Sequence, residues 1–175
     1  MVAAVEEDVA VEVGMVAFEG MAGLPAFLGN AASPHRAFCQ IPGQALRLQT
    51  VALRRFLAGG GALHDLLHRY TQAVMVFLAQ NLVCNRLHSA EERTARWLAQ
   101  THDRVGSDSF QITQEFLAQM LGVRRATVSV NARILQRAGL IRYSRGRITI
   151  LDREGLHAAA CDCYLTIRRE FDKLP

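Results

Sequence analysis

The sequence predicts an α+β fold that is mostly α-helical, and three observations carry this prediction. Residues 113–139 hold two short helical patterns separated by Gly122. A helical pattern free of proline and glycine runs from Leu63 to Leu87. The prolines before the C-terminal residue all lie in the first quarter, among several glycines. With 175 residues, half of them hydrophobic, the chain can bury a substantial core.

The first 58 residues are expected to form a turn-rich β region. Short apolar runs, Val11 to Phe18 and Ala45 to Leu48, alternate with proline and glycine there, which is typical of short strands. This end of the chain is also acidic, because its first twenty residues contain no Lys or Arg but contain Glu6, Glu7, Asp8, Glu12 and Glu19. The basic residues begin at Arg36, so the two ends differ in charge.

A long helix is predicted over residues 62–88. Leu63, Tyr70, Phe77 and Cys84 recur every seven residues, as a seam that packs on a second copy of the helix requires. A broad apolar face covering the β region explains the same stripe, so both interpretations stay open. The candidate dimerisation residues are Leu63, Leu66, Leu67, Tyr70, Val74, Phe77 and Leu78.

Helix-start signals and a glycine organise the next segment. The capping box that begins at Ser89 and ends at Glu92 predicts a helix toward Val105. Thr113 can cap the following short helix, and Gly122 supplies a sharp turn. A second helix over about 124–138 then has a buried stripe and an opposite polar stripe of Arg125, Ser129 and Arg133. This is a helix-turn-helix pattern.

The last segment predicts a β-hairpin followed by one helix. Leu140 to Tyr143 and Arg147 to Leu151 are β-branched and apolar runs, separated by Ser144-Arg145-Gly146. The hairpin therefore has a basic tip. Asp152 can cap a final helix that continues through Phe171.

Charge identifies double-stranded DNA as the first candidate partner. Between Thr113 and Arg147 the chain has seven arginines and one acid, Glu115, a concentrated footprint for phosphate. The candidate DNA-binding residues are Thr113, Gln114, Arg124, Arg125, Ala126, Thr127, Ser129, Val130, Arg133, Arg142, Arg145 and Arg147. A rival interpretation is a protein-interaction module that dimerises or docks RNA polymerase, with the arginines merely solvated.

No catalytic, metal or membrane signal accompanies this pattern. Cys39, Cys84, Cys161 and Cys163 include no Cys-x-x-Cys pair, so reduced structural thiols are expected, with no metal and no cofactor. Cys161 and Cys163 would face different ways on a helix, which argues against a redox or metal pair. No nucleophile sits in an activating motif, so no enzyme is predicted. The absence of a long apolar run and of a signal peptide predicts a cytoplasmic protein that binds no membrane.

The chain resembles the Crp/Fnr family of bacterial transcription regulators. The most specific matches are Ile112 to Val123, Arg125 to Ser129, and Ala138 to Ile141 with Arg147 to Ile150. The resemblance implies a shortened, degenerate cyclic-nucleotide-binding-like β-roll over 1–58, a dimerisation helix over 62–88, and a winged helix-turn-helix DNA-binding domain over 89–175.

Departures from the family pattern predict that cyclic AMP is not the effector. The family's acid after the phosphate-cassette glycine and its Arg-Ser pair are lacking, since the matching stretches read Met21 to Leu24 and Ser33 to Arg36. Leu78 and Ala79 stand where hydroxyls would meet the purine. The family β-roll needs roughly twice the sequence found before Leu63, so its first strands are expected to be missing, through truncation, a misassigned start or genuine reduction.

The recognition helix departs from the family pattern too. The resemblance makes Arg125 the base reader, able to bond guanine, whereas Ala126 and Val130 replace a base-reading acid and a second arginine. Arg124 stands where a capping Ser is usual. Thr127, Arg142, Arg145 and Arg147 are expected to contact phosphate. The sequence thus predicts a homodimeric regulator of unknown effector; the alternatives are a small-molecule or redox sensor and a winged-helix interaction module.

Overall fold

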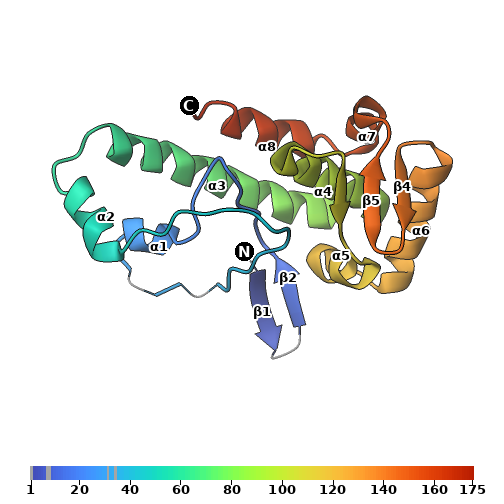
Figure 1. The fold of residues 1–175 in the computed structure, drawn as a ribbon, viewed down its shortest axis with the longest axis horizontal. Helices are drawn as coiled ribbons and strands as arrows, with labels where there is room; N and C mark the ends of the chain where they lie inside the picture. The colour runs from blue at the N-terminus through green and yellow to red at the C-terminus, as the bar shows by residue number, and fades with distance from the viewer. Residues whose placement is uncertain (1, 7–8, 31, 34) are drawn as a thin grey trace.

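The computed structural model describes residues 2–6, 9–30, 32–33 and 35–175, and it is mostly α-helical, as predicted. Pro34 and two of the N-terminal acids, Glu7 and Asp8, lie outside the described residues. One long helix, α3, runs through the middle of the elongated molecule to a C-terminal group of helices and a small sheet (Figure 1). Among the helices described, none combines the length and the apolar composition that crossing a membrane would take.

The C-terminal half is a winged helix, which confirms the predicted helix-turn-helix and hairpin. It contains α4 (Ala90–Val105), β3 (Ser109–Gln111), α5 (Gln114–Leu121), α6 (Arg125–Arg137), β4 (Ile141–Ser144) and β5 (Arg147–Ile150). The three strands are antiparallel in the order β3-β5-β4, and the edge strand β3 was not predicted. Leu98, Leu117, Val128, Leu135 and Ile148 fill the core between helices and sheet.

The prediction of a turn-rich β region over residues 1–58 is largely wrong. Its strands are β1 (Val2–Glu6) and β2 (Val9–Glu12), which pair antiparallel and lie beside α5. Residues 13–18 and 45–48 form no strand; instead, two helices follow, α1 (Leu24–Phe27) and α2 (Thr50–Leu57). Proline and glycine occur between short helices as readily as between strands. The composition of this region therefore did not distinguish the two, and the prediction of strands was wrong.

The N-terminal segment packs on the winged helix through buried polar contacts. Trp97 Nε1 on α4 donates a hydrogen bond of 3.2 Å to Glu12 Oε1, and Arg104 Nε lies 2.7 Å from Glu19 Oε1. Burial raises the pKa of the Glu12 carboxyl. Met15 belongs to the main core. The segment after β2 is therefore part of the structure that supports α4.

The long helix is confirmed as α3 (Ala62–Leu87), but the predicted seam already lies inside its own chain. Tyr70, Phe77 and Cys84 are buried, and the first two contact Phe171 of the C-terminal helix edge to face. Leu67 and Val74 are buried as well, Leu66 and Leu78 are half-buried, and Leu63 is exposed. The stripe therefore packs within its own chain, mainly against α8 and not against the β region that the sequence suggested as its cover.

The predicted final helix is two helices. Asp152 caps α7 (Arg153–Ala159) through a bond from the Gly155 amide, as expected. The backbone then becomes extended at Ala160, and α8 (Cys163–Phe171) begins after a turn. The break turns α8 back along α3, so the apolar stripe of the last segment packs inside the chain.

Candidate nucleic-acid interface

Local sequence signals shape the helix-turn-helix. The hydroxyl of Thr113 accepts a hydrogen bond of 3.1 Å from the Phe116 amide, which satisfies one free amide at the start of α5. Gly122 ends α5 with φ 63°, a left-handed conformation that glycine adopts without steric cost. Arg124 opens α6 without a side-chain cap, as its replacement of Ser implied. The turn thereby directs α6 across α5.

One face of α6 is held by the core and the other is open. Val128, Ala132 and Leu135 are buried, whereas the opposite stripe faces solvent. Asn131 is also buried, and its Nδ2 donates a hydrogen bond of 3.0 Å to Thr94 Oγ1 on α4. The sequence analysis missed this polar contact because it took only apolar residues as buried. Asn131 lies at the spacing of the buried stripe but has a polar side chain. The contact with Thr94 fixes the rotation of α6 about its axis.

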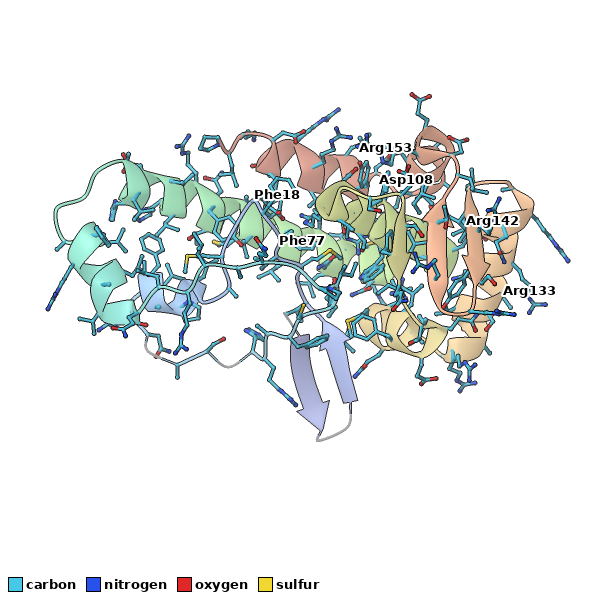
Figure 2. The ribbon with its side chains drawn as sticks, viewed as in Figure 1. Phe18, Phe77, Asp108, Arg133, Arg142 and Arg153 are labelled. Atoms are coloured by element: carbon cyan, nitrogen blue, oxygen red, sulfur yellow. The ribbon has the colours of Figure 1, made fainter. Side chains whose placement is uncertain are left out.

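The exposed stripe of α6 holds most of the predicted recognition residues. Arg124, Arg125, Ala126, Val130 and Arg133 are exposed, and Thr127 is half-buried. Ser129 is also on this side, but its hydroxyl donates a hydrogen bond of 2.6 Å to Gln114 Oε1. The Gln114–Ser129 pair thus joins the two helices of the motif. Figure 2 shows Arg133 on α6 and Arg142 on β4 at the same end of the molecule.

The wing ends in a two-residue turn with a strained arginine at its tip. Arg145 and Gly146 connect β4 to β5, with φ of 50° and 75°. Two successive positive φ values characterise the tight hairpin turn whose twist matches that of the strands. Arg145 is the one non-glycine residue with positive φ among those described. Such strain is often retained where a side chain has a function.

Four of the predicted DNA-binding residues line one open depression between the recognition helix and the wing tip. They are Thr113, Gln114, Arg125 and Arg145. Tyr143 forms part of its wall, and its hydroxyl donates a hydrogen bond of 2.8 Å to the Ile112 carbonyl. Burial raises the pKa of the Tyr143 phenol, so the ring stays neutral beside Arg125. Tyr143 was not among the predicted site residues.

Two wing arginines lie apart from this depression. The alternation along β4 and β5 places Arg142 and Arg147 on the face opposite the buried Ile141 and Ile148. Arg147 Nη1 donates a hydrogen bond of 3.4 Å to Ser109 Oγ on β3. These two arginines therefore extend the basic surface along the sheet.

The arginine at the start of α6 is only weakly restrained. Arg125 Nε lies 4.0 Å from Glu115 Oε2, and both side chains are more than two-thirds exposed. An exposed pair of this kind contributes about 0–1 kcal/mol, so Arg125 can leave Glu115 for a stronger acceptor. Its guanidinium offers the planar pair of donors that a guanine edge or a phosphate binds. The arrangement suits an anionic, base-bearing ligand.

Comparison with known proteins agrees with this geometry. Residues 92–159 match the profile of the Crp-like helix-turn-helix domain, which confirms the resemblance to the Crp/Fnr family for that part of the chain. None of the curated proteins compared with the chain matches it.

Two solved structures with TM-scores above 0.5 share the fold. FixK2 from Bradyrhizobium japonicum has a TM-score of 0.56 at 18% identity, over 65% of this chain and 60% of its own. A CooA mutant from Carboxydothermus hydrogenoformans has a TM-score of 0.51 at 18% identity, over 62% and 53%. A CRP-family transcriptional regulator from Thermus thermophilus has a TM-score of 0.47 at 24% identity, over 65% and 55%. The chain matches between 53% and 60% of the length of these three structures.

Proposed function

Because the chain contains a Crp-like helix-turn-helix domain, we propose that it is a homodimeric, sequence-specific DNA-binding regulator of transcription. In this proposal the exposed stripe of α6 enters the major groove, and the wing tip contacts the neighbouring phosphate backbone. Winged-helix domains read DNA through such a division, with base edges bound by the helix and phosphates by the flanking groups.

The observation that carries the proposal is the shared depression of Arg125 and Arg145. Both cations are exposed beside the start of α6, and among the described residues Glu115 is the only acid that lines the depression with them. Asn131 and the Gln114–Ser129 pair fix the orientation of α6 behind them. Exposed donors on a helix that is held in one orientation are what base-edge recognition requires.

A face of α3 other than the predicted seam suits the dimer contact. Gln72, Met75, Ala79, Leu82 and Arg86 follow one another at spacings of three and four, and all five are exposed. That spacing repeats every seven residues and is the pattern by which two helices pack side by side. Met75 and Leu82 are 65% and 74% exposed, which a lone helix in water would not favour. These five residues, here called the α3 stripe, lie on the side of α3 that α8 does not cover.

A two-fold dimer through the α3 stripe would present two recognition helices. Paired half-sites about one helical turn of DNA apart then match the symmetry of the protein. The proposed operator is therefore an inverted repeat.

The proposal is tested by separating base reading from phosphate contact. Arg125→Ala should weaken binding to the preferred operator by about 1–3 kcal/mol and relax discrimination at one base pair in each half-site. Arg145→Asn keeps a residue that tolerates positive φ but removes the charge, so it should weaken binding to all sequences alike. Its salt slope should fall by about one unit per lost phosphate contact. Fluorescence anisotropy on an operator series at several salt concentrations measures both effects.

Arg169→Ala is the matched control, because Arg169 is exposed on α8 away from the depression. It should leave both affinity and salt slope unchanged. Equal losses for Arg125→Ala on every DNA sequence would show that Arg125 does not read a base. No salt-dependent DNA binding by the unaltered protein would instead favour the protein-interaction module.

A second prediction concerns the effector: cyclic AMP should not stabilise the protein. The region where the resemblance would place the nucleotide is packed with apolar side chains, since Leu24, Tyr70 and Val74 form one cluster that Met21 and Leu78 join. A nucleotide bound with a Kd of about 10 µM would stabilise the native state by about 2.7 kcal/mol at 1 mM.

A thermal melt with 1 mM cyclic AMP, compared with sodium chloride at the same ionic strength, measures this. We expect coincident curves. A rise of several degrees over the salt control would show that a nucleotide site exists elsewhere in the chain.

A further inference from the structure

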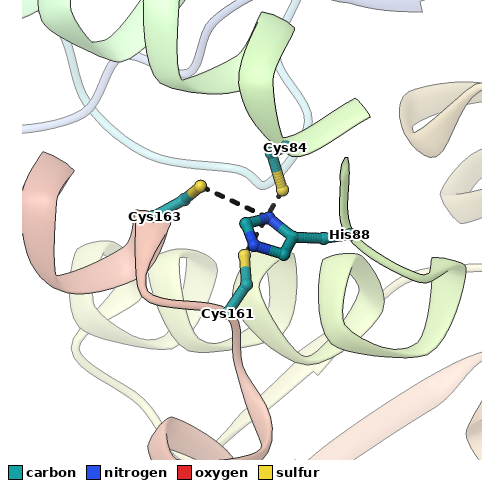
Figure 3. A group of neighbouring side chains, drawn as sticks. All are labelled: Cys84, His88, Cys161 and Cys163. Atoms are coloured by element: carbon teal, nitrogen blue, oxygen red, sulfur yellow. Dashed lines mark hydrogen bonds between the residues drawn. The ribbon is translucent and has the colours of Figure 1, made fainter. Parts of the chain in front are cut away.

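Four potential metal ligands converge where α3, the α3–α4 link and the α7–α8 turn meet. Cys84 lies in the last turn of α3, His88 follows that helix, and Cys161 and Cys163 lie on either side of the start of α8 (Figure 3). The ligand atoms all lie within 4.8 Å of one another. We propose that these residues form a tetrahedral Cys₃His site for a divalent cation of the zinc class.

The distances approach those of a closed zinc site. Cys84 Sγ lies 3.3 Å from Cys161 Sγ, and Cys163 Sγ lies 3.5 Å from His88 Nδ1. Zinc–sulfur and zinc–nitrogen bonds of about 2.3 and 2.0 Å place tetrahedral ligand atoms about 3.5–3.8 Å apart. Small side-chain rotations would bring the four ligands to that geometry. Three sulfurs and one imidazole favour zinc over calcium or magnesium, which prefer oxygen ligands.

The charge around the cluster supports an anionic group at its centre. Arg96 on α4 is buried, at 6% exposure, and its charge acts on the buried Glu12 carboxyl as well as on the three cysteines. Its Nη1 donates to Gln100 Oε1, but its Nε is buried without a hydrogen-bond partner among the described residues. A buried cation is costly unless nearby negative charge compensates it.

The proposed site supplies a further counter-charge for Arg96. A divalent cation, three thiolates and a neutral imidazole carry a net charge of −1, which the guanidinium of Arg96 balances. Electrostatic attraction from Arg96 favours the thiolate form of Cys84, Cys161 and Cys163. Arg96 is thus placed as a neighbour that tunes the ligands without binding the ion.

The Cys84 and Cys161 thiols share one hydrogen bond in the absence of an ion. This bond lowers the pKa of Cys84. The same shared proton raises the pKa of Cys161, and burial raises that of Cys163. The cation would displace the remaining thiol protons as it binds, because a coordinating cysteine is deprotonated.

The site would close the junction between the long helix and the winged helix. Its ligands belong to segments separated by 72 or more residues, from His88 at the start of the link to Cys161. A bound ion would fix α8 against the end of α3 and hold the link to α4 in one conformation. The metal site itself does not depend on the proposed function, but an effect of the ion on DNA affinity would rest on it.

Metal content and cobalt substitution test the proposal. The full chain, purified under reducing conditions, should contain one zinc per chain by elemental analysis. After removal with a chelator, stoichiometric Co²⁺ should give the visible bands of a tetrahedral ion and a thiolate charge-transfer band. Cys163→Ser should lose stoichiometric uptake, whereas Cys39→Ser, at an exposed cysteine outside the cluster, should retain it.

Arg96→Gln provides a second measurement that removes no ligand. It should weaken the Kd for Zn²⁺ by about 10–100-fold while the tetrahedral cobalt spectrum remains. If Cys163→Ser fails to fold, the zinc content and the cobalt spectrum of the unaltered chain still show whether the metal site exists. A chain that takes up no zinc or cobalt when reduced, or one that forms a Cys84–Cys161 disulfide as its stable native state, would overturn the proposal.

Discussion

Replacing Leu82 by Glu is expected to convert the proposed dimer into monomers and to weaken operator binding by about 100-fold to 10,000-fold. Leu82 belongs to the α3 stripe and is 74% exposed, so the substitution should disturb little of the packing within the chain. In a two-fold dimer the same position meets its own copy, and two carboxylates would be desolvated side by side. Analytical ultracentrifugation and operator titration measure the two effects.

Leu165→Glu is the control for this experiment. Leu165 is an exposed leucine of α8, at 46%, and it lies outside the α3 stripe. Its replacement should leave both the sedimentation coefficient and operator affinity unchanged. A Leu82→Glu protein that still sediments as a dimer would show that another surface joins the two copies. An unaltered protein that remains monomeric at micromolar concentration would remove the inverted-repeat operator from the proposal.

Sequence signals predicted the helix-turn-helix well because each of them is local. The Thr113 cap, the left-handed Gly122 and the capping box at Ser89 satisfy backbone groups within three or four residues. The Arg145-Gly146 turn likewise needs only its two residues to reverse the chain. Local rules of this kind do not require knowledge of which distant segments pack together.

Features that depend on distant segments were missed or misplaced. The seven-residue repeat exists on two sides of α3, and composition favoured the side of Tyr70 and Phe77, which α8 covers. No proline or glycine lies at the helix break near Ala160, so the sequence carries no signal for it. Without that break Cys161 and Cys163 appear to share a helix, so their convergence on Cys84 could not be foreseen.

Replacing Phe77 by Ala is expected to lower the free energy of unfolding by about 3–5 kcal/mol. Phe77 is 2% exposed, and its ring contacts Phe171 edge to face with centroids 6.1 Å apart. The Arg104 guanidinium lies 5.9 Å from the centre of the Phe77 ring. The substitution would therefore leave a cavity between α3 and α8 and remove one aromatic partner of a largely buried cation. Urea unfolding at one fixed protein concentration measures the loss.

The comparison with Leu165→Ala decides whether α8 stabilises the long helix from within the chain. Leu165 is on the exposed side of α8, so its truncation should change stability by no more than about 0.5 kcal/mol. If Phe77→Ala is equally mild, then Phe77 does not pack against Phe171 in solution, and the side of Phe77 becomes available to a second copy. If Phe77→Ala instead lowers the free energy of unfolding by several kcal/mol while the protein remains a dimer, then the two faces of α3 make different contacts. The Phe77 side would then hold α8, and the Leu82 side would join the partner.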